Sequence, residues 1–471
     1  MRRKRLLFAL GFVCAAGLLV LCLIAVFRLV RPGEIKLLTR ELSLGKRDPG
    51  MIGETFAVSP DSKRVAYVAP HGDKRLVVVD GVEGKEYDDW AAAVFSPDSK
   101  RLAYAAQRGD KWLVVVDGVE GKECDGIGAR GVIFSPESRR VAYGAKRGGK
   151  LLVVMDGAEG KEYDGIANLA FSPGGKRVAY AAVRADRWFV VVDGVEGKDY
   201  DGMERTPPSF SPDSKRLAYA AQRGDKWLVV VDGVEGKEYD GIVEGPCLFS
   251  PDGKRVAYLA MRGSKWLVVV DGVEGKEYDG IGKGGLFSPD SQRVAYAAVR
   301  GDRWFVVVDG VEGKEYAAFW AALIFSPDSK RVAYAASRDG MQSVVVDGVE
   351  GKEYDAILSL VFSPDNQRVA YEVRRGDKQL VVVDGVEGKE YEDVGLGSLV
   401  FSPDSKRVAY EAQRGDKWLV VVDGVEGKEY DGFLEGSRLV FDSPKQFHTL
   451  ARRGDEILRV EAEIVTPWLN L

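Results

Sequence analysis

Two patterns of hydrophobic positions divide the chain. Residues 6–27 form an apolar run of 22 residues without a charged side chain. From about residue 51 onward, the apolar positions come in short strings such as Val-Val-Val, separated by Gly, Asp, Ser and Pro. Short apolar strings bounded by turn residues predict β-strands. Because no long amphipathic stretch follows residue 27, the bulk of the chain is predicted to be all-β.

The apolar run predicts an uncleaved membrane anchor. A helix needs about 20 apolar residues to cross the hydrocarbon core, whereas the apolar region of a cleaved signal peptide is about 7–15 residues long. Cationic side chains in residues 1–5 favour a cytoplasmic N-terminus, although Arg28 and Arg31 oppose this bias. We therefore expect a single-pass protein, with residues 6–27 as a transmembrane signal anchor and the remainder in the periplasm or outside the cell.

One repeating unit accounts for most of the remaining chain. A Ser-Pro step recurs at intervals of 37–39 residues, with a final interval of 41. Self-similarity at this period predicts a repeat fold. The prolines that mark about eleven copies are Pro60, Pro97, Pro136, Pro173, Pro212, Pro251, Pro289, Pro327, Pro364, Pro403 and, in a degenerate copy, Pro444.

Each copy predicts four short antiparallel strands. The copy at 210–247 closes one strand at Phe210 and turns through Ser-Pro-Asp. Its later elements are predicted as a strand at 216–221, a tight hairpin at 223–226, a strand at 227–232, a glycine-dependent turn at 233–237 and a strand at 238–242. Four such strands form the blade of a β-propeller, and burial of both sheet faces between neighbouring blades accounts for the unbroken valines.

The two ends of the chain predict how the ring closes. The last copy supplies about three strands, and residues 35–44 could supply the fourth, which would remove an exposed sheet edge. We therefore assign 28–50 to a linker with a possible ring-closing strand and 51–471 to the propeller repeats. Propellers usually have about 4–8 blades, so eleven copies predict either one unusually large ring, which the even spacing favours, or two smaller rings.

The repeat resembles that of a known family. FSPDSKRVAY followed by VVVDG is similar to the WD-repeat-like unit of TolB-type bacterial propeller proteins, over residues 55–445. The resemblance implies the fold. It does not fix a function, because such blades occur in many envelope proteins.

Charge and chemistry narrow the function classes. Six of the 67 cationic side chains precede residue 33, so 61 basic residues face 72 acidic residues in the rest of the chain, a net charge of −11. This argues against a nucleic-acid partner. Only His71 and His448 are present, no catalytic motif accompanies them, and no alternating carboxylate run suits calcium. We expect no enzymatic activity, no cofactor and no metal.

Comparison between copies predicts a binding face. The two turns Pro-Asp-Ser-Lys and Asp-Gly-Val-Glu-Gly-Lys hardly change, while the link from the fourth strand to the next blade varies. Loops diversify where a scaffold meets its partners, so these links and the adjacent Arg-Gly-Asp hairpins form the predicted binding face. The candidate partner-binding residues are Trp90, Arg205, Pro207, Pro208, Phe319 and Trp320. Packing into a local gap is the alternative role for Trp90 and Trp320.

These observations predict a membrane-tethered, non-catalytic scaffold that mediates protein–protein interaction outside the cytoplasm. A carbohydrate- or small-ligand-binding envelope sensor that uses the centre of the ring is one alternative. A rigid spacer without a specific site is another.

Overall fold

The computed structural model describes residues 35–46, 56–242, 247–282 and 286–466. Within these ranges, no helix has the length and apolar character needed to cross a membrane. The predicted anchor at 6–27 lies outside the described residues, as do residues 28–34 and 47–50 of the linker.

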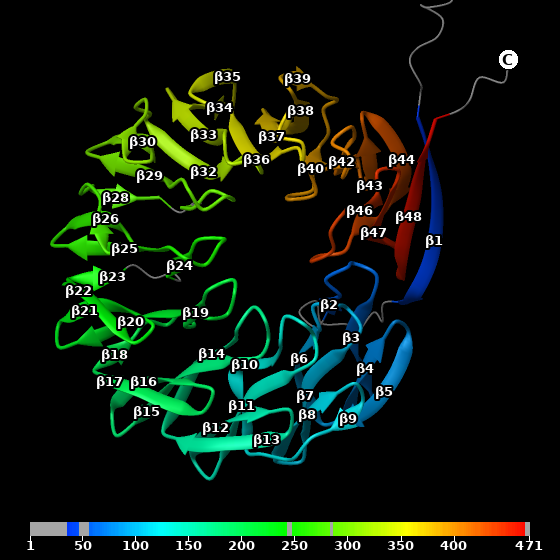
Figure 1. Cartoon of the computed structure of the whole chain (residues 1–471). Helices are drawn as coiled ribbons and strands as arrows, with labels where there is room; N and C mark the ends of the chain where they lie inside the picture. Colours follow the sequence, from blue (N-terminus) through cyan, green and yellow to red (C-terminus); the bar gives the residue numbers. More distant parts are fainter. Residues whose placement is uncertain (1–34, 47–55, 243–246, 283–285, 467–471) are drawn as a thin grey trace, which may run out of the picture.

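Eleven antiparallel sheets form one ring (Figure 1). We number the blades in chain order, so that blade 1 contains β2–β5 and blade 11 contains β45–β48 together with β1. The strands nearest the ring axis are β2 (Phe56–Val58), β6 (Asp89–Phe95), β10 (Gly126–Phe134), β14 (Gly165–Phe171), β18 (Gly202–Met203), β19 (Ser209–Phe210), β23 (Gly241–Ile242), β24 (Leu248–Phe249), β28 (Gly280–Ile281), β32 (Ala318–Phe325), β36 (Ala356–Phe362), β40 (Asp393–Val394), β41 (Val400–Phe401), β45 (Gly432–Phe433) and β46 (Val440–Ser443).

Each inner strand is followed outward by a second and a third strand. The second strands are β3 (Val65–His71), β7 (Leu102–Arg108), β11 (Val141–Arg147), β15 (Val178–Arg184), β20 (Leu217–Arg223), β25 (Val256–Arg262), β29 (Ala295–Arg300), β33 (Val332–Arg338), β37 (Val369–Arg375), β42 (Val408–Arg414) and β47 (Gln446–Arg453). The third strands are β4 (Lys74–Val79), β8 (Lys111–Val116), β12 (Lys150–Met155), β16 (Arg187–Val192), β21 (Lys226–Val231), β26 (Lys265–Val270), β30 (Arg303–Val308), β34 (Met341–Val346), β38 (Lys378–Val383), β43 (Lys417–Val422) and β48 (Glu456–Val465).

The fourth strand forms the outer edge of each blade. These strands are β5 (Val82–Tyr87), β9 (Val119–Glu120), β13 (Ala158–Tyr163), β17 (Val195–Tyr200), β22 (Val234–Tyr239), β27 (Val273–Glu274), β31 (Val311–Glu312), β35 (Val349–Tyr354), β39 (Val386–Glu387), β44 (Val425–Tyr430) and, in blade 11, β1 (Lys36–Lys46). The four-stranded blade, the single ring and the closing role of the N-terminal strand are thus confirmed.

The predicted position of the outer turn was wrong. The expected turn at 233–237 is a two-residue turn at Asp232 and Gly233, and Val231 pairs directly with Val234. Both turn residues have positive φ, 54° and 81°, as the tight hairpin turn with a right-handed twist requires. The outer strand therefore begins at Val234 and not at Glu238. The inner hairpin prediction is confirmed, because Arg223 pairs with Lys226.

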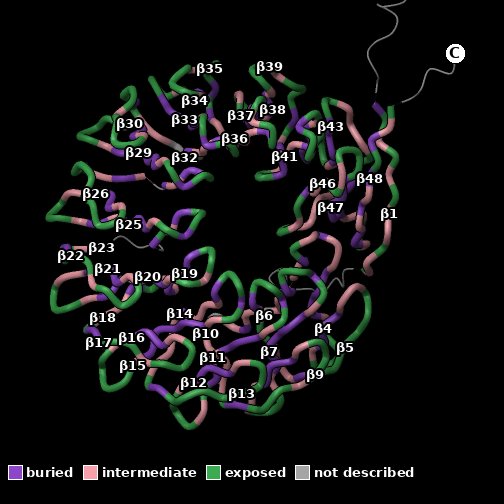
Figure 2. The backbone as a smooth tube through the Cα atoms, in the orientation of Figure 1, coloured by how far each residue is buried: buried purple, intermediate pink, exposed green. Residues whose placement is uncertain are grey.

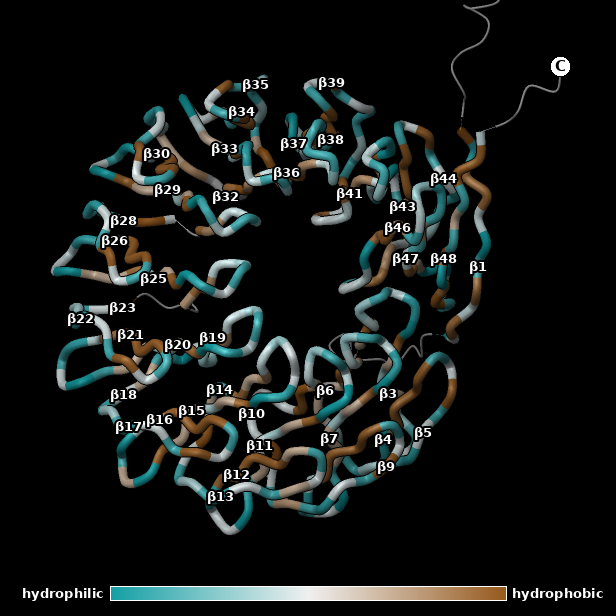
Figure 3. Tube along the Cα trace, in the orientation of Figure 1, coloured by the Kyte–Doolittle hydropathy of each residue, from teal (hydrophilic) through white to brown (hydrophobic). Residues whose placement is uncertain are grey.

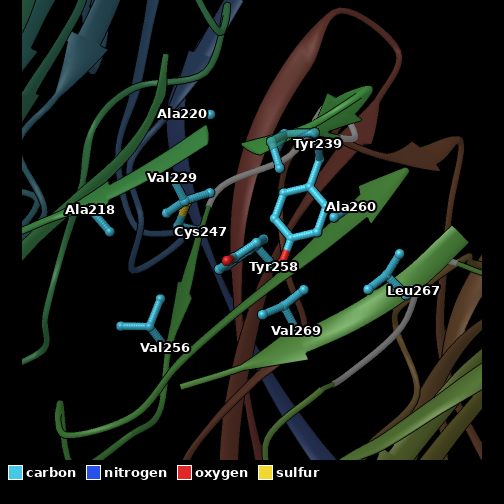
Figure 4. Packing of buried hydrophobic residues seen from close by; sticks show 11 residues of the cluster. Ala218, Ala220, Val229, Tyr239, Cys247, Val256, Tyr258, Ala260, Leu267 and Val269 are labelled. Carbon is cyan, nitrogen blue, oxygen red and sulfur yellow. The ribbon is translucent and has the colours of Figure 1, made fainter. Parts of the chain in front are cut away.

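The hydrophobic core lies between neighbouring blades. Around β20 and β25, Val229 and Tyr239 of blade 5 pack against Tyr258, Leu267 and Val269 of blade 6 (Figure 4). Buried and hydrophobic stretches follow the middle strands of each blade, while the turns and outer strands are exposed and polar (Figures 2 and 3). Burying one such aliphatic side chain contributes roughly 1.5–3 kcal/mol.

Polar contacts link the blades at one rim, which we call the turn face because it carries the Ser-Pro-Asp and Asp-Gly turns. Ser96 is fully buried and its hydroxyl donates to Asp98 over 2.6 Å, so the repeated serine serves the turn. Arg101 forms an ion pair with Asp117 at 2.7 Å and donates to the carbonyl of Arg139 in the next blade at 2.9 Å.

The opposite rim, the hairpin face, carries the hairpins between second and third strands and the links between blades. Asp125, in the link after blade 2, accepts a hydrogen bond from the backbone N–H of Gly148 in blade 3 at 2.8 Å. Lys111 Nζ lies 2.8 Å from the same carboxylate. We call this arrangement the Asp–Gly latch, and it recurs at most junctions, where it fixes the link to the hairpin of the following blade.

Blade 11 closes the ring with contacts that imitate those of the repeat. Glu41 of β1 accepts from Tyr430 at 2.9 Å and pairs with Arg453 and Lys428. Glu196 of blade 4 makes the equivalent contacts, to Arg184 in its own blade and to Tyr163 and Lys161 in blade 3. On the turn face, His448 Nε2 lies 2.5 Å from the carbonyl oxygen of Asp61 in blade 1. The N-terminal strand therefore substitutes for an ordinary outer strand.

Candidate interaction surface

All length variation between repeats falls in one segment. From the residue before Ser-Pro to the buried tyrosine at the end of the outer edge, which is Cys124 in blade 2, the separation is 29 positions in every complete repeat. Examples are Phe95 to Cys124, Phe210 to Tyr239 and Phe401 to Tyr430. The variable segments between them occupy 88–94, 125–133, 164–170, 201–209, 240–248, 279–286, 317–324, 355–361, 392–400 and 431–440. The rest of the repeat is a constant framework.

The variable segments lie mainly in the inner strands. The prediction placed Asp89, Trp90 and Phe319 in links on the hairpin face, but β6 and β32 contain them. The register of β6 shifts between Ala91 and Val94, and in blade 5 the inner strand is interrupted between β18 and β19. Such bulges redirect side chains and end regular pairing. Variation is therefore tolerated where the inner edge of each blade is irregular.

The start of a variable segment is held rigidly. Asp201 accepts a hydrogen bond from the N–H of Gly224 at 2.7 Å, as the latch requires. That N–H holds the pKa of Asp201 below its ordinary value. At the junction of blades 7 and 8, Ala317 occupies the latch position and lacks the carboxylate.

Trp90 and Phe319 pack within the ring. Trp90 is half-buried against the cluster between blades 1 and 2 that includes Tyr87 and Phe95. The ring of Phe319 lies 6.3 Å from that of Trp304 and 6.3 Å from that of Tyr334. These contacts support the packing alternative for Trp90 and give Phe319 a similar role. Their assignment to partner binding stays a prediction.

The other predicted residues divide by exposure. Arg205 is exposed, Pro207 is half-buried and Pro208 is buried. Trp320 lies in β32, and its side chain is not among the described ones. The structure brings Arg205, Pro207 and Pro208 together in one segment but places Trp90, Phe319 and Trp320 in other blades.

Sequence reasoning missed two positions, an exposed leucine and a buried glutamate. Leu396, in the variable segment of blade 10, is 82% exposed. The sequence signal that could have found it is a leucine between two glycines. Glu372 is fully buried on β37, at a position where alanine is the commonest residue among the copies. Burial raises the pKa of Glu372 to about 7, and the charge of Asp393 acts in the same direction.

Glu411 occupies the equivalent position in blade 10. Burial also raises its pKa to about 7, and Thr449 of blade 11 donates a hydrogen bond to it at 2.9 Å. Both carboxylate oxygens of Glu372 lack a hydrogen bond among the described residues. The alanine-to-glutamate change between copies was the available sequence signal.

Ligand chemistry can be assessed for the described part of the chain. Within it, no three His, Cys, Asp or Glu side chains gather in an arrangement that could hold a metal ion. Cys124 and Cys247 are buried and form no disulfide, and burial raises the pKa of Cys247 to about 12. A buried, protonated thiol is a poor nucleophile.

The similarities of this chain to known proteins are distant. No protein-family model matches the chain, and no curated protein matches it. A crystal structure of the eukaryotic initiation factor is 13% identical with a TM-score of 0.40, over 75% of this chain and 91% of the other. TolB from Acinetobacter baumannii is 17% identical with a TM-score of 0.25, over 48% of this chain and 64% of TolB.

The β-propeller domain of the Trilobed protease from Pyrococcus furiosus is similar over its full length. It is 14% identical with a TM-score of 0.27, covering 58% of this chain and 100% of that domain. At these identities the similarities concern the fold alone. The chain is an eleven-bladed β-propeller with distant structural similarity to TolB and other propellers.

Proposed function

We propose that this protein is a non-catalytic scaffold that binds a protein partner through its variable segments. The observation that carries the proposal is the division of each repeat into a framework of constant length and one variable segment. The β-propeller is a fold commonly used for protein binding, and sequence varies where such a scaffold meets different partners.

The proposal includes the placement of the scaffold. Residues 6–27 act as its membrane anchor, with residues 1–5 in the cytoplasm and the ring in the periplasm or outside the cell. The repeat residues FSPDSKRVAY and VVVDG support a relationship to TolB-type envelope propellers. The acidic excess beyond residue 33 favours a protein surface over nucleic acid as the partner.

The test is affinity capture from detergent-solubilised membranes, with identification of captured proteins by mass spectrometry. The intact protein is compared with an Arg205→Glu, Leu396→Asp double variant. Both side chains are exposed in variable segments, so the fold should persist. Lys215→Glu is the matched control, because Lys215 is exposed on the turn face.

We expect a partner that the intact protein and the control capture equally and that the double variant captures at least roughly tenfold less, since charge reversal at an interface costs several kcal/mol. Equal capture by all three proteins, or capture of no partner, would contradict the proposal.

A further inference from the structure

Grooves of one kind recur between neighbouring blades on the turn face. The groove between blades 9 and 10 has a volume of about 470 Å³. Its apolar lining comes from Val381, Val383, Val386, Val408 and Tyr410, and the charged residues Arg368, Asp384, Glu387, Lys406 and Asp423 line it as well. Equivalent grooves of about 560 Å³ and 430 Å³ lie between blades 5 and 6 and between blades 2 and 3. The repeat thus builds the same apolar concavity several times.

Each groove leaves a valine exposed to solvent. Val386 is 71% exposed because the Asp-Gly turn ends the blade directly beside it. The equivalent valines, all 70–72% exposed, are Val82, Val119, Val195, Val234, Val273, Val311 and Val349. Repeated exposure of an aliphatic side chain beside an apolar groove is characteristic of an interaction surface.

One junction of the ring shows what fills such a groove. Between blades 10 and 11, β1 and β48 continue beyond the level of the Asp-Gly turns, as the pairing of Leu37 with Ile464 shows. Ile35 is 4% exposed there and packs in one cluster with Val420 and Val422 of blade 10, while Leu37 packs against the same cluster. Figure 1 shows this strand pair at the outer edge of the ring.

Two valines of blade 10 are less exposed beneath this strand pair than their counterparts in blade 9. Val422 is fully buried and Val425 is half-buried, whereas their counterparts in blade 9, Val383 and Val386, are half-buried and exposed. A Cβ at Gly427 would lie 3.2 Å from Leu37 Cδ1, so the aliphatic side chain reaches the floor of the groove. The occupant is an extended segment with aliphatic residues at alternate positions, Ile35 and Leu37.

We propose that the open inter-blade grooves of the turn face bind extended peptide segments of a partner protein that carry two aliphatic residues separated by one residue. In a strand, residues i and i+2 point to the same side, so such a pair can enter the groove as Ile35 and Leu37 do. Recurrence of the groove allows several segments of one partner to bind together, which raises the overall affinity of weak sites.

The ligand needs no acidic residue after the aliphatic pair. At the filled junction, Glu41 follows Leu37 and pairs with Lys428 and Arg453. At the groove between blades 9 and 10, the equivalent cations, Lys389 and Arg414, are already paired with the framework residue Glu426. Binding at the open grooves therefore depends on the aliphatic pair.

The test uses the intact, detergent-solubilised protein and a peptide of residues 33–38, Gly-Glu-Ile-Lys-Leu-Leu, with photo-leucine at the position of Leu37. The control peptide carries Ile35→Asp. After irradiation, tryptic peptides are mapped by mass spectrometry. Residues 379–389 of blade 9 form a tryptic peptide of unique sequence, whereas 112–122 is identical to its counterparts in blades 5, 6 and 10.

We expect saturable labelling of 379–389 and of the shared 112–122 sequence, with at least roughly tenfold less labelling by the control peptide. In the Val386→Asp variant, labelling at 379–389 should fall at least roughly fivefold, while the shared sequence is labelled as before. That internal comparison separates loss of one groove from loss of the fold.

Three results would overturn the proposal. The control peptide could label as strongly as the aliphatic peptide, or Val386→Asp could leave the labelling of blade 9 unchanged. Labelling could also be confined to β48, which would indicate exchange with β1.

Light scattering tests a different occupant. If it shows oligomers that Val386→Asp dissociates, the occupant is a second copy of this chain and not a separate partner. Because the grooves lie on the turn face, these outcomes are independent of capture through Arg205 and Leu396.

Discussion

Blades 1 to 9 each have an arginine that contacts the following blade. Arg177 forms an ion pair with Asp193 at 3.0 Å, lies over the ring of Phe210 in the next blade at 5.3 Å and donates to the carbonyl of Lys215. A planar guanidinium with several donors can make all these contacts at once, which lysine cannot. The constant residues of the repeat therefore connect blades as well as shape them.

The buried glutamates predict an unusual pH dependence of stability. The folded-state pKa of Glu372, about 7, exceeds the ordinary value of 4.5, so the folded protein holds an extra proton between about pH 4.5 and 7. The contribution of this group to the free energy of unfolding therefore falls as pH rises through that window, by roughly 3 kcal/mol, and changes little above it.

Glu372→Gln should remove this dependence. We expect the variant to gain up to roughly 3 kcal/mol in free energy of unfolding, relative to the unaltered protein, between pH 4.5 and pH 8. Urea denaturation at the two pH values measures the difference, with the exposed Glu353→Gln as control. A constant difference between the two pH values would show that Glu372 titrates normally.

Glu41, at the ring closure, contributes a pH dependence of stability with the opposite sign. The guanidinium of Arg453 lowers the pKa of Glu41 to about 2, with further contributions from Lys428 and Tyr430. Because the folded pKa lies below the ordinary value, the stabilisation is present above about pH 4.5 and is lost as pH falls toward 2.

Glu41→Gln should loosen the closing strand more than the rest of the ring. We expect trypsin to cut within β1, after Arg40, roughly tenfold faster, which corresponds to about 1.4 kcal/mol in the opening equilibrium. Glu235→Gln, at the equivalent position of blade 5, is the control. Equal cleavage of β1 in both variants would mean that Glu41 does not hold the strand.

At the scale of elements, the links between blades depend on the Asp–Gly latch. Blades 7 and 8 are joined without it, because Ala317 replaces the aspartate. Arg303 stands where Lys111 supplies the cation in blade 2, and its ion pair with Asp302 is long, at 3.7 Å, and exposed. A carboxylate at 317 would meet this cation and the N–H of Asp339.

Ala317→Asp should therefore stabilise the protein by about 1 kcal/mol, the typical net value of one additional hydrogen bond, because the site is exposed to solvent. Thermal or urea unfolding measures the gain, and Ala317→Ser, which adds no carboxylate, is the control. If Ala317→Asp proves neutral or destabilising, repulsion from the side chain of Asp339 outweighs the new latch.

The sequence predicted most elements but not their exact arrangement. Glycine-rich turns and valine strings located the hairpin at Arg223–Lys226, and the missing fourth strand of the last copy indicated the closing strand. The Asp232-Gly233 pair, flanked by valines, was already a strong hairpin signal, and treating the following Glu-Gly-Lys as turn overlooked it. The inner strands were harder to predict because bulges interrupt their alternation, so Trp90 and Phe319 appeared to lie in links.

The candidate site was less predictable for a physical reason. Exposure of Arg205 and burial of Pro208 depend on packing against neighbouring blades, which spacing does not specify. Burial of Glu372 depends in the same way on its position in the middle of a blade. The inter-blade grooves became apparent only through comparison of Val386 with Val425 in the folded ring.

At the scale of the whole molecule, the anchor and the ring are expected to be separable. The full chain should remain in the membrane pellet after extraction at alkaline pH if the 22 apolar residues at 6–27 form the proposed anchor. A chain beginning at residue 33 should be soluble and keep its β-sheet circular dichroism. Extraction of the full chain at alkaline pH would contradict the anchor.

The central claim is that eleven blades form one ring closed by the N-terminal strand, since the framework, the variable segments and the grooves all derive from that arrangement. Single-particle electron microscopy of the detergent-solubilised protein tests it most directly. We expect one closed ring of eleven radial blades, with density for residues 35–46 along the outer edge of blade 11. Two smaller rings, or an open arc with this strand detached, would contradict it.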